Sequence, residues 1–340
     1  MPCSRLEIPE PMSDGRFIVG VDVGGTNVVV GTVPEDGSKI YGLRQVPTRV
    51  NNGAEAVVKQ IGILVQESLD ATRATLGPEI EVAGVGIGAP GPLDTARGVV
   101  LLTPNLGWVN FPLRDRVSET VGLPATLDND ANCAIFGEWW RGAARGAKDV
   151  IGLTIGTGIG GGIVLDGRIY HGSSDMAAEF GHMSIDSTGR QCKCGNYGCL
   201  EAYASGTAIA ERAREGADAG AETSLGQYVD GDLSALTAAD VYEAAKNGDE
   251  YALEVIKDTA RFLGAGISNL INIFNPELVV VCGGVTAAGD RLFTPLKSEV
   301  RRRAFRPAVE ACRIVAGELP GTAGVFGAVA AFKFQTWGDV

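Results

Sequence analysis

The chain has 340 residues, a formal net charge of −12 and 45% hydrophobic residues. This length suffices for two domains of ordinary size, and the hydrophobic content suffices for their cores. Because the acidic balance disfavours contact with nucleic acid or with an anionic membrane, we expect neither partner. No uninterrupted apolar run is long enough to span a bilayer. Residues 1–16 contain prolines and charges but no apolar secretory core, so a disordered tail is predicted there.

The first predicted strand, residues 17–21, runs into a glycine turn that extends from Asp22 to Asn27. A second strand follows directly, so the unit differs from the strand–loop–helix of Rossmann and P-loop sites. Glycine lacks a Cβ atom, and the backbone N–H groups of Gly24 and Gly25 can therefore approach a phosphate closely. Asp22 is a candidate Mg²⁺ ligand, directly or through water. The alternative is an ordinary hairpin turn without a ligand.

Strand and helix patterns continue to residue 141. They predict, in order, a strand at 40–46, a helix through 57–69, a buried strand at 82–88, a loop containing Asn105, a helix through 113–121, a strand at 125–127 and a helix at 131–141. Asn129 and Asp130 stand where the last strand meets the last helix. From sequence alone Asp130 suits two roles, the N-cap of that helix or a carboxylate directed into a cleft.

The second half of the chain repeats the arrangement of the first. A strand at 150–155 leads into a glycine turn at 156–161, which contains Thr157 and Gly158, and a return strand is predicted at 162–165. We therefore predict a duplicated strand–turn–strand unit in which each half supplies one phosphate clamp.

The region after residue 201 is predicted to be mostly helical. In order, we expect a helix capped by Thr237, a long helix from about 249 to 275, a buried strand at 278–281 that opens onto the glycine turn Gly283-Gly284, and a last helix at 323–334.

The most informative stretch holds one of the two histidines and three of the seven cysteines. His182, Cys192, Cys194 and Cys199 follow the order H-x9-C-x-C-x4-C, and four such ligands suit tetrahedral Zn²⁺. The alternative is a set of unrelated buried thiols beside a surface histidine. An odd number of cysteines, three of them assigned to zinc, fits the reducing cytoplasm, where we expect the protein to reside.

Two carboxylates flank this stretch, Glu179 before the histidine and Glu201 after the last cysteine. If zinc takes one ring nitrogen of His182, the other nitrogen must find a second partner, and that partner fixes the ring. A polyhydroxylated ligand that bridges the three side chains would meet one donor and two acceptors. In the alternative, both carboxylates are solvated or cap helices.

Together these motifs resemble the ROK family (repressors, open reading frames, kinases) over nearly the whole chain from Phe17 onward. The resemblance implies an α/β actin-like fold of the sugar kinase and Hsp70 type, with a nucleotide cleft between two domains. It implies a small domain of residues 17–128 and 323–340, and a large domain of residues 129–322 that carries the zinc loop. It also implies a homo-oligomer, either a dimer or a dimer of dimers.

The resemblance further implies roles for individual residues. Asp130 is implied as the catalytic base, and the sugar contacts as Asn105, Asn129, Asp130, Glu179, His182 and Glu201. The ATP contacts are implied to be Asp22, Gly24, Gly25, Thr26, Asn27, Thr157, Gly158, Gly283 and Gly284, with Mg²⁺ bound. The ligands of a structural Zn²⁺ are implied to be His182, Cys192, Cys194 and Cys199.

The activity that the resemblance implies is transfer of a phosphoryl group from ATP to the 6-hydroxyl of glucose. Fructose, mannose and N-acetylmannosamine are alternative substrates, because the same polar groups contact hydroxyls that these sugars share. Polyphosphate is an alternative donor, although relatives that use it typically lack the cysteine loop. A sugar-sensing repressor is disfavoured, since only about sixteen residues precede the first strand and the acidic charge opposes DNA binding.

Overall fold

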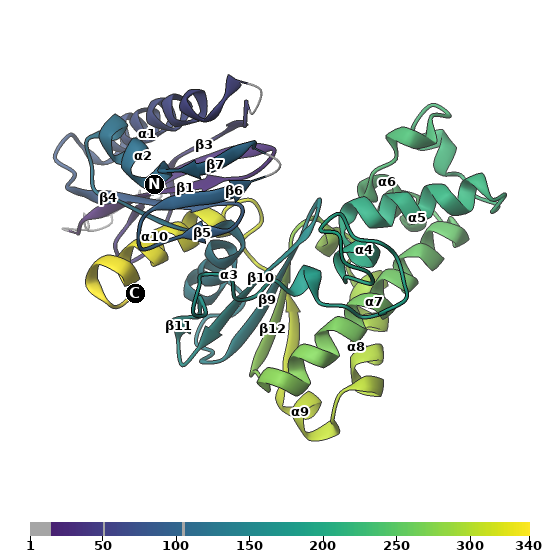
Figure 1. Ribbon diagram of the computed structural model, residues 1–340. Coiled ribbons are helices and arrows are strands. Elements are labelled where there is room, and N and C mark those ends of the chain that lie inside the picture. Colours follow the sequence, from purple (N-terminus) through teal and green to yellow (C-terminus); the bar gives the residue numbers. More distant parts are fainter. Residues whose placement is uncertain (1–14, 50–51, 104–105) are drawn as a thin grey trace, which may run out of the picture.

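The computed structural model describes residues 15–49, 52–103 and 106–340. Nearly all of the disordered tail predicted for residues 1–16, and the predicted sugar contact Asn105, lie outside these ranges. Within them, no helix combines the length and the apolar character that a membrane span requires. The α/β class predicted from the sequence is confirmed (Figure 1).

Two five-stranded sheets share one topology. The first has the order β3-β2-β1-β4-β8 and contains β1 (Phe17–Val23), β2 (Asn27–Pro34), β3 (Tyr41–Pro47), β4 (Val82–Ala89) and β8 (Ala125–Asn129). The second has the order β11-β10-β9-β12-β13 and contains β9 (Val150–Ile155), β10 (Ile159–Leu165), β11 (Arg168–Ile169), β12 (Leu278–Cys282) and β13 (Arg313–Ala316). In each sheet the first two pairings are antiparallel and the last two are parallel. The predicted duplication is therefore confirmed at the level of the whole sheet.

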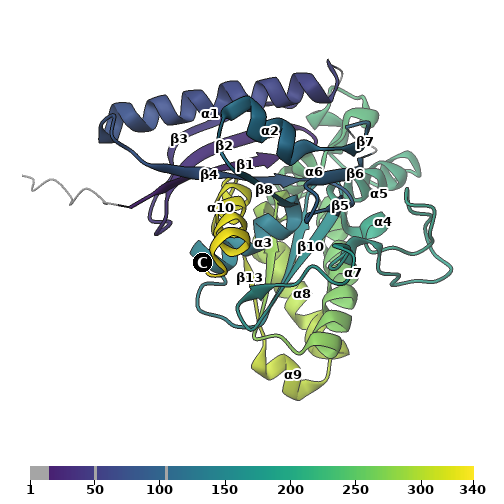
Figure 2. The ribbon, with the colours of Figure 1, turned by 60° about the vertical axis from the view of Figure 1, so that its left-hand side comes forward.

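The helices lie in three groups around the two sheets (Figures 1 and 2). The first sheet packs against α1 (Ala54–Leu76) and α2 (Leu113–Val121), and between the sheets lie α3 (Asp130–Arg141) and α10 (Ala323–Trp337). On the other side of the second sheet lie α7 (Glu250–Phe274) and α8 (Asp290–Arg303), which pack against each other and share one buried core with its strands. Beyond them, α4 (Glu201–Ala204), α5 (Gly206–Asp218) and α6 (Ala238–Lys246) pack against α7, and α9 (Arg306–Ala311) contacts α7 and α8. We call the first sheet with α1 and α2 the N-terminal lobe, and the second sheet with α4 to α9 the C-terminal lobe.

One helix from the end of the chain joins both lobes. Helix α10 is buried from Gly324 to Lys333 without an exposed stripe, because it packs against β1, β4 and α3 at once. A helix that is apolar all round is expected in such an interior position. The sequence predicted this helix at 323–334, and it continues to Trp337.

Three local features differ from the sequence predictions. Strand β10 begins at Ile159 rather than at residue 162, because Ile159 to Gly161 already pair with β9. A small three-stranded sheet of β5 (Leu93–Asp94), β6 (Val99–Thr103) and β7 (Trp108–Phe111) was not expected. The N-cap of α3 is Asn129, whose Oδ1 accepts hydrogen bonds from Ala131 and Asn132, and Asp130 is the first residue of the helix. The N-cap role considered for Asp130 is therefore wrong.

Candidate active site and metal centre

The glycine turn between β1 and β2 is held in shape by its own backbone and by one distant threonine. The Gly24 N–H donates to the Asn27 carbonyl at 2.8 Å. Thr48, at the end of β3, donates through Oγ1 to the Gly24 carbonyl at 2.7 Å and through N–H to the Thr26 carbonyl at 2.8 Å. Gly25 is exposed, and a Cβ added there would meet no atom within 4 Å. The turn is thus rigid at its base and open at its tip.

The equivalent turn between β9 and β10 is tied to Glu201. The Glu201 Oε2 accepts a hydrogen bond from the Ile159 N–H at 2.8 Å, and a Cβ on Gly158 would lie 2.5 Å from the same oxygen. Only glycine fits at position 158 without moving this carboxylate. Thr207, in the first turn of α5, donates through Oγ1 to the Thr157 carbonyl at 2.9 Å. Glu201 therefore connects the predicted phosphate turn to the end of the cysteine loop.

A cavity of about 850 Å³ lies beside this second turn. Its walls include Thr157 from the second turn and Gly284 from the third. Both residues were predicted as nucleotide contacts, which requires them to lie close together. Gly283 precedes Gly284 with a φ of 93°, and a Cβ there would lie 2.2 Å from the Ile155 carbonyl oxygen, so glycine is required. Sequence reasoning missed further wall residues: Thr237, Tyr242 and Lys246 from α6 and its N-cap, and Arg291 from α8. The first turn, Gly24 to Asn27, is not part of these walls.

Asp130 stands where β8 passes into α3, and its surroundings are set by two close contacts of β10. A Cβ on Gly160 would lie 2.7 Å from the Ala131 Cβ, next to Asp130. A Cβ on Gly161 would lie 2.5 Å from the Ala178 carbonyl oxygen, next to Glu179. The start of α3 and the segment before Glu179 can approach the same strand only because these two positions lack side chains. Gly160 and Gly161, predicted as the end of the glycine turn, are therefore strand residues that allow close packing.

The carboxylates that meet here have perturbed acidity. Desolvation raises the pKa of Asp130 to about 6; the charge of Glu179 adds to the rise, and backbone N–H donors oppose it. Desolvation also raises the pKa of Asp22 to about 7, with a smaller contribution from the charge of Asp130. The Asp22 carboxylate lies against the start of α10, where a Cβ on Gly324 would be 2.1 Å from Oδ2. Such clustered, desolvated carboxylates are typical of catalytic and cation-binding sites.

The four predicted metal ligands come together in the cysteine loop. One ligand atom from each of His182, Cys192, Cys194 and Cys199 lies within 4.8 Å of all the others. The Cys194 and Cys199 sulfurs are 3.7 Å apart, and the Cys192 sulfur is 3.8 Å from the His182 Nδ1. Sulfur atoms bound at about 2.3 Å to a tetrahedral ion lie about 3.8 Å apart, so the spacing and the donor types both fit Zn²⁺.

The two ring nitrogens of His182 face different neighbours. Its Nδ1 faces the cysteine sulfurs, whereas its Nε2 lies 4.0 Å from the Glu179 Oε2. Both side chains are partly exposed, at 38% and 49%. The remaining carboxylate oxygen of Glu201, Oε1, lies 3.9 Å from the Cys192 sulfur. An exposed edge of hydrogen-bonding groups thus runs beside the metal site, next to Asp130.

The two-sheet architecture with this site defines a protein of the actin-like α/β class. Residues 18–335 match the model of the ROK family, and the chain belongs to that family. The solved structure of a ROK family glucokinase from Streptomyces griseus, in complex with glucose and AMPPNP, superposes with a TM-score of 0.80. It is 37% identical in sequence, and the match covers 92% of this chain and 98% of that one.

Relatives by sequence include both enzymes and regulators. A glucokinase from Halalkalibacterium halodurans is 39% identical over 317 residues, which cover 93% of this chain and 94% of that protein. A xylose repressor from Caldicellulosiruptor bescii is 31% identical over 318 residues, which cover 93% of this chain and 78% of the repressor.

Proposed function

We propose that the protein is a glucokinase that transfers the γ-phosphoryl group of ATP to the 6-hydroxyl of glucose. The observation that carries this proposal is the placement of Asp130, a carboxylate with a raised pKa, beside the exposed edge of Glu179 and His182. The cavity lined by Thr157 and Gly284 supplies room for a nucleotide beside the turn between β9 and β10. The glucose and AMPPNP bound to the Streptomyces griseus relative, and the glucokinase from Halalkalibacterium halodurans, support the choice of substrates.

In the proposed reaction the oxygen of the sugar 6-hydroxyl bonds to the γ-phosphorus, and Asp130 accepts the proton of that hydroxyl. The bond from that phosphorus to the bridging oxygen breaks, and ADP leaves with the electron pair. Phosphoryl transfer requires mainly positioning and charge stabilisation, which suits a site of hydrogen-bonding groups on rigid turns. Asn105, Asn129, Glu179, His182 and Glu201 would hold the sugar, and the turns at Gly24 to Asn27, at Thr157-Gly158 and at Gly283-Gly284 would hold ATP.

The two metal ions have separate roles in this proposal. Mg²⁺, when bound, neutralises charge on the transferred phosphate, and Asp22 is the residue that would hold it, directly or through water. The desolvated carboxylate of Asp22 next to Asp130 fits a cation. Zn²⁺ would be structural, because four protein ligands leave a tetrahedral ion no open position.

Domain bounds, assembly and compartment complete the proposal. The packing of α10 against both β1 and α3 supports a small domain of residues 17–128 and 323–340 joined to a large domain of residues 129–322. The family resemblance supports a dimer or a dimer of dimers. A thiolate metal site needs reduced cysteines, which supports a reducing compartment such as the cytoplasm.

A coupled assay of ADP release tests the proposal. Glucose, mannose, fructose and N-acetylmannosamine are compared as acceptors, with ATP and polyphosphate as donors. We expect kcat/KM for glucose with ATP to exceed the other values at least about tenfold, because one misplaced buried hydroxyl strands a polar partner worth about 1–3 kcal/mol. A higher value for another hexose would replace glucose as the substrate. A protein that binds glucose but transfers no phosphate to any sugar would favour the sugar-sensing role of the repressor relatives.

A further inference from the structure

The segment from Tyr170 to Glu179 connects β11 to the proposed sugar site and has an unusual backbone. Its His171 carbonyl accepts a hydrogen bond from the Ala177 N–H at 3.1 Å, which closes the segment into a compact loop. Two residues that are not glycine have positive φ angles, Asp175 at 57° and Ala178 at 68°. Left-handed conformations disfavour residues with a Cβ, so this loop needs outside contacts to hold its shape. Ala178 directly precedes Glu179.

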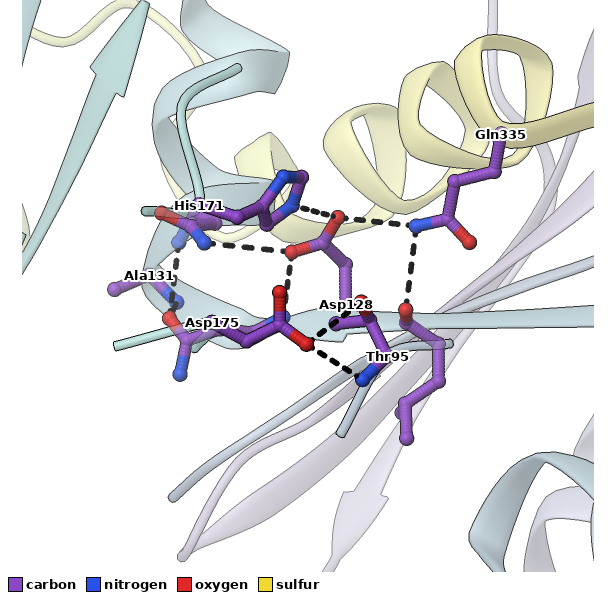
Figure 3. A network of polar contacts seen from close by, with 9 residues as sticks. Thr95, Asp128, Ala131, His171, Asp175 and Gln335 are labelled. Atoms are coloured by element: carbon purple, nitrogen blue, oxygen red, sulfur yellow. Dashed lines mark hydrogen bonds and ion pairs between the residues drawn. The ribbon is translucent and has the colours of Figure 1, made fainter. Parts of the chain in front are cut away.

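The first outside contact is made by His171, which reaches the junction that carries Asp130 (Figure 3). Its Nε2 donates to the Asp128 Oδ2 at 2.8 Å, and the same oxygen accepts a hydrogen bond from the Gln335 Nε2 at 3.1 Å. The other oxygen of Asp128 accepts the backbone N–H of Asn129 at 2.8 Å. Asp128 is only 1% exposed, so it depends on these donors in place of water. Through Asp128, His171 is linked to the backbone two residues before Asp130.

The second outside contact is made by Asp175, which reaches the small sheet next to the N-terminal lobe. Its Oδ2 accepts hydrogen bonds from both the N–H and the Oγ1 of Thr95, each at 2.9 Å. Thr95 directly follows β5, in the small sheet beside the first lobe. The dashed contacts in Figure 3 join Asp175 to Thr95 on one side and His171 to Asp128 on the other. The loop is therefore fixed at two points that lie outside its own lobe.

We propose that His171 and Asp175 are positioning residues for phosphoryl transfer, which hold Glu179 in place relative to Asp130. The inference rests on the proposed function of Asp130 and Glu179. The two contacts compensate the strained backbone at Asp175 and Ala178, and without them the loop relaxes and carries Glu179 away from the base. A displacement of about 1 Å at a reacting group can lower the rate about a hundredfold. Neither positioning residue is one of the proposed sugar contacts.

The test compares His171→Leu with His171→Gln, whose amide Nε2 can still donate toward Asp128. For His171→Leu we expect kcat to fall at least about tenfold and KM for glucose to rise, with KM for ATP within about twofold of the wild type. His171→Gln should recover most of the loss. Asp175→Ala, altered at a partly exposed position, should show the same pattern, and the double variant should lose less than the product of the two single losses because both act through one loop.

A matched control separates positioning from general stability. Glu299→Gln breaks the ion pairs of Glu299 with Arg302 and Arg303 on α8, far along the chain from the loop. It should lower Tm without changing kcat or either KM. If His171→Leu and Asp175→Ala behave like this control, both residues are merely structural and the inference is wrong. If the wild type in the same assay phosphorylates no hexose, the proposed function fails and the inference fails with it.

Discussion

The Nε2 atom of His182 lies 4.0 Å from the Oε2 atom of Glu179, on the side of the ring that faces away from the cysteine sulfurs. A metal on Nδ1 would fix both the tautomer and the orientation of the ring. Nε2 would then carry the proton and present it toward Glu179 and the proposed sugar site. The proposed metal centre and the proposed sugar site would therefore share one side chain, although none of the cysteines is a proposed sugar contact.

We predict that Cys194→Ala lowers zinc content and glucose affinity together. Loss of one thiolate weakens metal binding, and His182 then loses the metal ion that orients its ring. Binding of ATP should suffer less, because its proposed contacts lie on the glycine turns. The measurement is metal analysis of the purified variant beside separate calorimetric titrations with glucose and with ATP.

Cys312→Ala is the matched control, since Cys312 lies outside the four-residue cluster and is only partly buried. It should keep both zinc and glucose affinity. Full glucose affinity in a zinc-free Cys194→Ala protein would contradict the prediction and leave the cysteine loop with a purely structural role.

Asp130→Asn should abolish most turnover without unfolding the protein. Asn129 caps α3, and an asparagine at 130 keeps an oxygen for the Ala131 N–H that Asp130 now accepts. The amide cannot take the proton of the sugar hydroxyl, and loss of a general base lowers rates about 10²- to 10⁴-fold. Tm and kcat are measured together. A variant that keeps a tenth of wild-type turnover would remove Asp130 from the mechanism.

The acidity of Asp130 predicts the pH profile of the wild type. With a pKa of about 6, the Asp130 carboxylate is protonated below that pH and could not then act as the proposed base. We expect kcat/KM for glucose to fall about tenfold per pH unit below 6 and to level off above it. Stopped assays across pH 4.5 to 8, with coupling enzymes kept out of the reaction, would measure this limb. A flat profile between pH 5 and 7 would contradict the assignment.

The features predicted correctly from the sequence are those formed by residues that lie close together along the chain. The candidate metal ligands fall within eighteen positions, from His182 to Cys199, and the glycine turns are continuous, so both were visible as local patterns. The duplicated strand–turn–strand unit was predicted because its pattern recurs in both halves of the chain, and the structure extends the duplication to two whole sheets. The N-cap of α3 was missed because Asn129 and Asp130 both suit that position, and only the backbone decides between them.

Contacts between distant segments could not be predicted in the same way. Thr48 supports a turn that begins 24 residues earlier, and the contact of His171 with Asp128 spans 43 residues. Strand β5 has two residues, too few for an alternating pattern. Helix α6 lines the large cavity only because the fold packs it against α5 and α7. Such features arise from packing and have no local sequence signal.

Gly25→Val should lower ATP affinity much more than glucose affinity. The Cβ of the added side chain would meet no protein atom within 4 Å, so the variant protein should fold normally. The side chain would then fill the space where the phosphate is proposed to lie. Gly226→Val is the control, because a Cβ there also meets nothing within 4 Å and the position lies outside the proposed site. Calorimetric titrations with ATP and glucose measure both variants, and unchanged nucleotide binding in Gly25→Val would exclude this turn as a clamp.

Asp22→Asn should stabilise the magnesium-free protein more at pH 8 than at pH 5. The folded state raises the pKa of Asp22 to about 7, well above that of an unfolded aspartate near 3.9, so folding favours the protonated form. The stabilisation from this group is complete below the unfolded pKa and is lost as the pH rises through about 7. Asparagine cannot ionise and avoids that loss, so the Tm difference between variant and wild type should grow from pH 5 to pH 8. Addition of Mg²⁺ and ATP should raise Tm more in the wild type, which alone can offer the carboxylate. A Tm difference that stays constant with pH would show that the Asp22 carboxylate is not desolvated.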